Sequence, residues 1–302
     1  MEAPVGVNNS IPPPPPVESP QSPNTTTMTT TSAAVCVYSD PYQDDEVDPA
    51  SCILYALLTS GSGGEGGGSG DKNNNNFLLN RQQSNGNNNG VSWKAKPSWG
   101  IYVKDQGDHL PKFNLPRNVF YVDDGLNHLV SLSLADTCIS KFAVDAIVNS
   151  TTWDFCPDNG VSKVLNEEAG PSLRMACASL TPLDMGQVII TEGFNLPAKY
   201  IIHTNGPHGM EPGWETNLQL CYQKSLQLLI DKGLRTIVFP CISTGSKSAD
   251  PSLAARISLN TVRHFLQGHR DKVDRVIFSL HNTHQIVLYR RFMQWFFPVD
   301  IG

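Results

Sequence analysis

The sequence predicts an α/β fold in which a mixed, mostly parallel sheet lies between layers of helices. Three observations favour this fold class. Short segments rich in Val, Ile and Phe recur in the carboxyl-terminal two thirds of the chain. Segments with apolar residues at helical spacing separate them, and Gly, Pro and Asn mark many of the boundaries. Such alternation of strands and helices is typical of sheets whose neighbouring strands run parallel.

The predicted strands are short and contain many β-branched or aromatic residues. A strand that is buried on both faces appears in the sequence as a short apolar run. Two of the predicted strands, 146–149 and 236–240, are followed by small polar residues, which is how parallel sheets present loops to a ligand at their carboxyl edge. In chain order the predicted strands are 128–134, 146–149, 187–191, 200–204, 236–240 and 275–280.

The longer predicted helices have recognisable ends. The segment 216–232 carries apolar residues at helical spacing and stops at Gly233, a residue suited to the end of a helix. Asp250 and Pro251 provide an N-cap and a first-turn proline for the next helix. A last helix is predicted to begin with Thr283 as its cap.

Residues 1–90 are predicted to form a disordered, low-complexity tail. Tracts of Pro, Thr, Gly and Asn dominate this segment, and such a composition cannot bury enough apolar surface to offset the entropy of ordering. The tail also contains an apolar stretch at 53–58. This stretch is either part of a solvated linker or a short motif that binds a protein partner. Residues 91–115, which contain several aromatic side chains, are predicted to be a linker or domain edge, and 116–300 the folded domain.

Composition and charge argue against several classes of function. A net charge of −6 disfavours a surface that binds nucleic acid through its phosphates. The longest apolar run of the amino-terminal region is too short to cross a membrane, so neither a membrane span nor secretion is expected. Seven cysteines, with no C-x-x-C pair and no zinc spacing, predict reduced thiols of the cytoplasm or nucleus, and neither a metal nor a cofactor is expected.

Two loops at strand ends predict a site for a diphosphate. The first follows the strand 146–149 and leads into a short helix that ends at Gly170 and Pro171, and N–H groups at such a helix start bind anions. The second follows the strand 236–240 and offers two hydroxyl groups and a glycine amide. An ordinary turn is the alternative for either loop alone, but two such loops in one α/β domain are the expected pair for a diphosphate. The residues predicted to hold it are Gly160, Val161, Ser162, Ser243, Thr244 and Gly245.

Three runs of sequence resemble, in order, the signatures of the macro domain family. They are V-D-A-I-V-N at 144–149, the segment 191–207 with G-Q at 186–187 before it, and F-P-C-I-S-T-G at 239–245. The resemblance runs from about residue 136 to about residue 297, and the pair Val161-Ser162 with W-F-F-P at 295–298 resembles one branch of the family. It implies a three-layer α/β/α fold that binds ADP-ribose, either free or attached to a protein, with the diphosphate between the two loops. The residues implied for the ribose and adenine side are Asn149, Asp136, Cys138 and Ile139.

The chain departs from this resemblance at positions that matter for chemistry. Hydrolytic members of the family read N-A-A-N where this chain has N-S-T-T at 149–152, so Thr152 stands at the second Asn. Ser162 stands where those members carry an Asp, and a hydroxyl cannot act as a general base near neutral pH. The resemblance therefore implies a non-catalytic binder of ADP-ribose that acts as a reader or scaffold. The alternatives are a mono-ADP-ribosyl hydrolase with a degenerate active site and a structural domain that no longer binds nucleotide.

Other polar residues near these loops have more than one interpretation. Cys138 aligns with a family Asp that accepts from adenine, and Asp136 lies two residues before it. Lys247 is either a cation for a phosphate or an ordinary surface lysine. His203 is predicted to be a hydrogen-bonded structural histidine rather than a catalytic one, and Cys241 to be an inert thiol.

Overall fold

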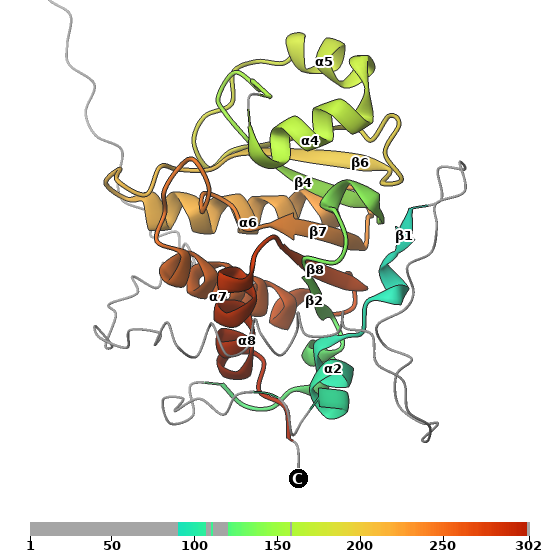
Figure 1. Cartoon of the computed structure of the whole chain (residues 1–302), viewed down its shortest axis with the longest axis vertical. Coiled ribbons are helices and arrows are strands. Elements are labelled where there is room, and N and C mark those ends of the chain that lie inside the picture. The colour runs from blue at the N-terminus through green and yellow to red at the C-terminus, as the bar shows by residue number, and fades with distance from the viewer. Residues whose placement is uncertain (1–89, 107–109, 111–119, 158, 301–302) are drawn as a thin grey trace, which may run out of the picture. The chain divides into compact units, whose positions relative to one another are not determined.

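A computed structural model describes residues 90–106, 110, 120–157 and 159–300 of the chain (Figure 1). The predicted disordered tail, apart from its last residue, lies outside the described residues, and so does any motif within it. Among the helices that are described, none combines the length and the apolar content needed to span a bilayer.

A six-stranded sheet forms the centre of the described fold, with the strand order β2-β8-β7-β4-β6-β5 (Figure 1). Neighbouring strands are parallel, except that β5 pairs antiparallel with β6. The predicted mixed, mostly parallel sheet is therefore confirmed. The strands are β2 Val130–Leu134, β4 Ala146–Thr151, β5 Val188–Glu192, β6 Tyr200–Asn205, β7 Thr236–Pro240 and β8 Arg275–Leu280.

The helices that flank this sheet begin and end at residues with clear local chemistry. Asp250 caps α7 as predicted, since its side chain accepts from Leu253 N at 2.6 Å. The cap of α8 is Asn282 and not the predicted Thr283, because Asn282 keeps an extended backbone and its side chain accepts from Gln285 N at 2.9 Å. The helices are α4 Gly160–Ala169, α5 Pro171–Ala178, α6 Trp214–Asp231, α7 Pro251–His269 and α8 Thr283–Phe296.

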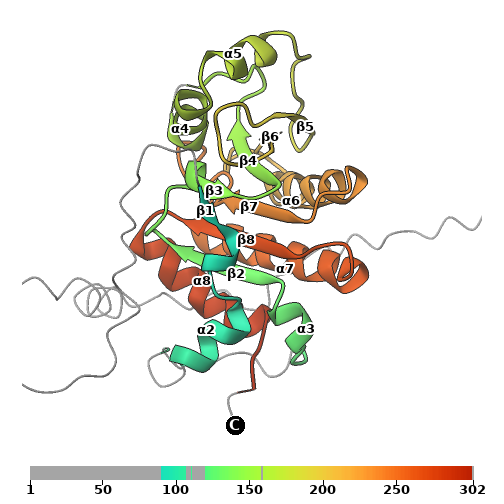
Figure 2. The ribbon, with the colours of Figure 1, turned by 90° about the vertical axis from the view of Figure 1, so that its right-hand side faces the viewer.

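Side chains of the central strands alternate between two apolar clusters, one on each face of the sheet. Val148 and Ile202 lie in the cluster that α6, α7 and α8 cover. Their neighbours Ile147 and Ile201 lie in the cluster that α4 and α5 cover. Figure 2 shows helices on both faces of the sheet, and the three-layer α/β/α arrangement is confirmed.

The segment before the sheet is packed onto the same folded unit. Strand β1 (Val91–Ser92) pairs with β3 (Phe142–Ala143) in parallel (Figure 2). Helix α2 (Trp99–Gln106) buries Trp99, whose Nε1 donates to Phe297 O at 2.8 Å. A further short helix, α3 (Asp124–Asn127), leads into β2. Residues 91–103 therefore contribute to the apolar core as well as connecting to it.

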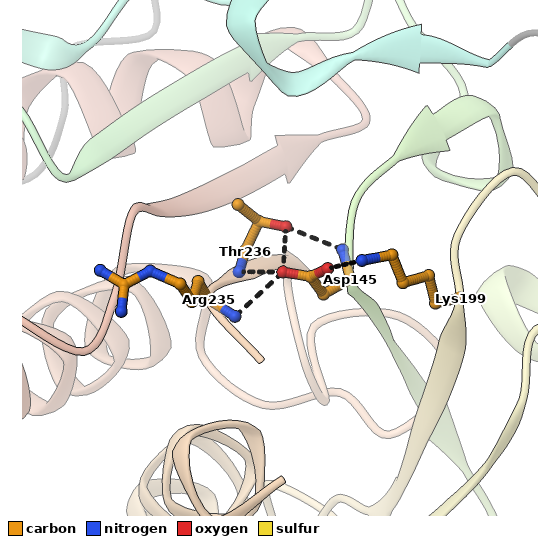
Figure 3. A network of polar contacts seen from close by, with 4 residues as sticks. All are labelled: Asp145, Lys199, Arg235 and Thr236. Carbon is orange, nitrogen blue, oxygen red and sulfur yellow. Dashed lines mark hydrogen bonds and ion pairs between the residues drawn. The ribbon is translucent and has the colours of Figure 1, made fainter. Parts of the chain in front are cut away.

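A network around Asp145 fixes the amino-terminal ends of three central strands (Figure 3). One carboxylate oxygen pairs with Lys199 Nζ at 2.7 Å, and the other accepts from the N–H groups of Arg235 and Thr236, each at 2.9 Å. Burial alone would raise the pKa of Asp145, but these hydrogen bonds hold the pKa below its ordinary value. Asp145 precedes β4, Lys199 precedes β6 and Thr236 begins β7. The network therefore links the three strands at the edge of the sheet where they begin.

Candidate functional site

The candidate site lies where the strand order of the sheet reverses. After β4 the chain forms β5 and β6, which lie on one side of β4 in the sheet, and then β7 and β8, which lie on the other side. In open α/β sheets, ligands bind at such a point, outside the carboxyl ends of the strands. The ladder between β4 and β7 stops at Ile147↔Val238, whereas the ladder between β4 and β6 continues to Thr151↔Asn205. The carboxyl ends of β4 and β7 are therefore not paired with each other.

The first predicted loop ends in the start of α4. Asn159 is the N-cap residue and gives no side-chain hydrogen bond to the first turn. Gly160 has a φ of +55°, and a Cβ added there would meet nothing within 4 Å. Only glycine adopts this left-handed backbone readily, and the first-turn N–H groups of a helix point outward from its start. This loop has the geometry of an anion-binding helix terminus.

The second predicted loop follows β7 and is strained at its first residue. Ser243 has a φ of +67°, which is uncommon for a residue with a side chain, and its buried Oγ has no hydrogen-bond partner. The Thr244 hydroxyl donates to Cys241 O at 2.9 Å and accepts from Gln285 Nε2 at 3.3 Å, so it is used within the fold. Gly245 is exposed, and a Cβ there would also meet nothing within 4 Å. Its amide, and not the Thr244 hydroxyl, is the group open to a ligand.

A direct contact brings the two loops together. Ser246 Oγ donates to Asn159 Oδ1 at 3.3 Å, from one residue after Gly245 to one residue before Gly160. The two glycines that the sequence singled out therefore lie on neighbouring turns. Neither Ser246 nor Asn159 is among the predicted site residues, because no local pattern indicates that loops 87 residues apart in the chain will meet.

Asn149 and Ser162 lie beneath the first loop, in contact with each other. Asn149 Nδ2 is 3.4 Å from Ser162 Oγ, which in turn donates to Thr151 Oγ1 at 3.4 Å. All three side chains are buried, on the face of β4 that α4 covers. The Ser162 hydroxyl therefore points toward the sheet, and only its backbone belongs to the helix start. Asn149 Oδ1 is buried without a partner.

His203 extends this polar cluster into β6 and is fully buried. Its Nδ1 accepts from Asn149 Nδ2 at 3.1 Å, which leaves the proton on Nε2, 2.9 Å from Thr191 Oγ1. Burial lowers the pKa of His203 to about 4, so the ring is neutral at physiological pH. The prediction of a structural, hydrogen-bonded histidine is confirmed.

The residues implied for the adenine side are already engaged with other residues of the fold. Asp136 pairs with Lys96 at 2.5 Å and accepts from Ser133 Oγ at 3.2 Å. Burial would raise the pKa of Asp136, but the hydrogen bond and charge of Lys96 keep the pKa below its ordinary value. Cys138 is exposed, with its Sγ 3.2 Å from Ser140 Oγ. Ile139 is buried in the apolar cluster that α4 covers.

Lys247 is not an ordinary surface lysine, because its ammonium group is hydrogen-bonded within the fold and is not free to contact a phosphate directly. It donates to Thr151 O, Asn205 Oδ1 and Gly206 O, and burial lowers the pKa of this lysine. Cys241 stays a predicted inert thiol, and burial raises the pKa of this thiol to about 12, which favours that prediction. Within the part of the chain that the structure describes, no group of three or more His, Cys, Asp and Glu side chains is placed to hold a metal ion.

Sequence comparison identifies relatives of this chain. The family model described as Macro domain matches residues 148–258. A macro domain-containing protein of Ralstonia nicotianae is 40% identical over 162 residues, which cover 53% of this chain and 92% of that protein. ADP-ribose glycohydrolase MACROD2 of Xenopus laevis is 41% identical over 167 residues, which cover 54% of this chain and 40% of that protein. The chain thus matches less than two thirds of the length of this glycohydrolase.

Solved structures share the same fold. The macro domain of ganglioside induced differentiation associated protein 2 superimposes with a TM-score of 0.62 at 27% identity, covering 70% of this chain and 98% of that domain. It represents the branch that the Val161-Ser162 pair resembles. A macrodomain of Trypanosoma brucei in complex with ADP-ribose superimposes with a TM-score of 0.56 at 28% identity, covering 67% of this chain and 76% of that one.

Proposed function

Because this chain belongs to the macro domain family, we propose that it binds ADP-ribose, free or attached to a protein, and holds it without hydrolysis. In this proposal the diphosphate lies between the start of α4 and the turn at Gly245. The names of two relatives support the choice of ligand, since one is an ADP-ribose glycohydrolase and the other was solved with ADP-ribose bound.

The observation that carries the proposal is the contact between Ser246 and Asn159, which sets two open glycine turns side by side. A diphosphate carries oxygen atoms that can accept from amides on both sides, and the helix start favours its negative charge. Two buried polar atoms without partners, Asn149 Oδ1 and Ser243 Oγ, lie at the same ends of β4 and β7. Such atoms are rare in folded proteins and are common where a ligand or water completes the structure.

The residues at the hydrolytic positions support binding rather than catalysis. The Ser162 hydroxyl is buried against Asn149 and Thr151. Thr152 Oγ1 donates to Asp154 Oδ1 at 2.6 Å and accepts from Cys156 N at 3.1 Å. Neither hydroxyl can take a proton from water near pH 7, and loss of a general base costs about 10²- to 10⁴-fold in rate.

Hydrolysis of mono-ADP-ribose is the second candidate function, and the identity of 41% to a glycohydrolase favours it. A mono-ADP-ribosylated protein incubated with the wild-type chain separates the two candidates. We expect the ADP-ribose group to remain attached to the modified protein. Release of ADP-ribose by the wild-type chain, abolished by Gly245→Val, would show that the chain is an enzyme.

Isothermal titration with ADP-ribose, ADP and AMP tests binding directly. We expect ADP-ribose and ADP to bind more tightly than AMP, because only they span both turns. Gly245→Val is expected to weaken ADP-ribose binding by at least about tenfold, since a side chain there enters the space beside the amide. Gly268→Val is the matched control, because its added Cβ also meets nothing but lies in α7. If millimolar ADP-ribose produces no heat of binding and no thermal shift, the proposal is excluded.

A further inference from the structure

The ammonium group of Lys247 is held by three oxygen atoms at the ends of two strands. It donates to Thr151 O and Asn205 Oδ1, each at 3.0 Å, and to Gly206 O at 2.5 Å. Thr151 ends β4, and Asn205 ends β6. An ammonium group has three protons to donate, so these acceptors use all of them. The side chain therefore reaches from the loop after β7 to the carboxyl edge of the neighbouring strands.

Among the described residues no carboxylate forms an ion pair with this ammonium group, and the charge of Glu211 acts on it only from a distance. The acceptors of the ammonium group are two carbonyl oxygens and one amide oxygen, all of them neutral. None of the ion pairs formed among the described residues includes Lys247. A partly buried cation that forms no ion pair is costly for the folded state, and a nearby anion lowers that cost. The position of Lys247 thus favours an anionic ligand over a neutral one.

Backbone hydrogen bonds fix the segment around Lys247 to the loop after β6 and to the turn 243–245. Lys247 O accepts from Gly209 N at 2.8 Å, and Ala249 N donates to Ser243 O at 3.0 Å. A Cβ on Gly209 would lie 2.4 Å from Ala249 Cα, so the loop after β6 is in close contact with this segment. Ser246, the residue before Lys247, makes the contact with the first loop. Lys247 is therefore the side chain that joins the second loop to the strand ends.

From these contacts we infer that Lys247 is the positioning residue of the diphosphate site. It pins the turn 243–245 to the ends of β4 and β6 and places a positive charge beneath the ligand, without touching the ligand itself. This inference rests on the proposed binding of ADP-ribose. It accounts for a lysine in a place where it forms no ion pair with a described residue.

Three variants of the full chain test the inference by titration with ADP-ribose, ADP and AMP. Lys247→Met keeps most of the side-chain volume but removes the charge and the donors, Lys247→Arg keeps both, and Lys232→Met removes an exposed charge far from the site. We expect Lys247→Met to weaken ADP-ribose and ADP about tenfold and AMP about threefold or less. Lys247→Arg should recover part of the loss, and Lys232→Met should bind as the wild type does.

Two results of these titrations would overturn the inference. One is an unchanged affinity of Lys247→Met for ADP-ribose, and the other is an equal loss for all three ligands, which would indicate general damage to the fold. Hydrogen exchange of the amides at 243–249 in the ligand-free protein separates this inference from the proposed function. Faster exchange in Lys247→Met than in Lys247→Arg supports the positioning role even if wild type binds no ADP-ribose, and unchanged exchange contradicts it.

Discussion

The hydroxyl groups of Ser162 and Ser246 have different partners at the candidate site. Ser162 was expected in the diphosphate loop, yet its hydroxyl packs against β4, while Ser246, which was not expected, spans the two loops. The N-cap and the glycine of the first loop are local properties, and they can be predicted from the sequence. The contacts of Ser246 and Lys247 depend on how separate strand ends meet. No local pattern contains that information.

His203 makes the stability of the protein depend on pH. Its folded pKa of about 4 lies below the ordinary value of 6.5, because burial disfavours the charged ring. The unfolded chain therefore binds the proton first, so this stabilisation is complete above pH 6.5 and is lost as the pH falls from 6.5 toward 4. We expect a loss of about 3 kcal/mol in the free energy of unfolding over this range.

Urea denaturation at a series of pH values measures this effect, with His203→Gln as the comparison. Glutamine is neutral at all these values, so the variant should lose less stability on acidification than wild type does. The groups that face the ring are Asn149, Thr191 and Phe155, none of which titrates, so the difference reports on His203 alone. Parallel curves for the two proteins would contradict the prediction.

Strands and helices differ in how far the sequence determines them. Strands β7 and β8 have the predicted bounds, because each is a short apolar run between turn residues. Strand β4 extends beyond its predicted end at Asn149 to Thr151, because its pairing with β6 continues through polar residues. The sequence does not predict helix α5, because a proline after a helical segment indicates its end, whereas Pro171 also occupies the first turn of the next helix.

The network at the amino-terminal ends of the central strands gives a second prediction. Asp145→Asn removes the charge that pairs with Lys199 and weakens the bonds from Arg235 N and Thr236 N (Figure 3). We expect a loss of about 2 kcal/mol in the free energy of unfolding at pH 7, since hydrogen bonds to charged groups contribute about 1.5–3 kcal/mol. Because the pKa of Asp145 is lowered, this stabilisation is present above the ordinary pKa of about 3.9 and is lost as the pH falls below it.

A matched control for Asp145→Asn lies in the loop between α7 and β8. Asp274 pairs with the side chain of Arg235 at 2.8 Å, but both side chains are largely exposed to solvent. Asp274→Asn should therefore cost far less stability, because water screens an exposed ion pair. Denaturation curves of the two variants at pH 7 and pH 3.5 test both statements. An equal loss for the two variants at pH 7 would show that the bonds around Asp145 have no special weight.

The chain as a whole combines a folded unit with a long amino-terminal region of different composition. The predicted folded domain begins at residue 116, yet Val91 and Ser92 pair with β3 and Trp99 is buried against the carboxyl-terminal end. Aromatic residues in a polar stretch indicate that the stretch packs on something. They do not indicate whether it packs as a removable edge or as part of the core. A deletion series therefore tests the domain limits directly.

Removal of residues 1–89 is expected to leave the melting temperature unchanged, because that segment lacks the composition of a core. Removal of 1–115 should destabilise the protein, since it takes away Trp99, which is 1% exposed and donates to Phe297 O. Trp99→Ala alone should cost about 3–5 kcal/mol in the full chain. Trp153→Ala is the control for the loss of an indole, because that side chain is 61% exposed and should cost about 0.5 kcal/mol or less. If both tryptophan variants have the melting temperature of the wild type, the segment before residue 116 is a dispensable edge and the folded domain is limited to residues 116–300.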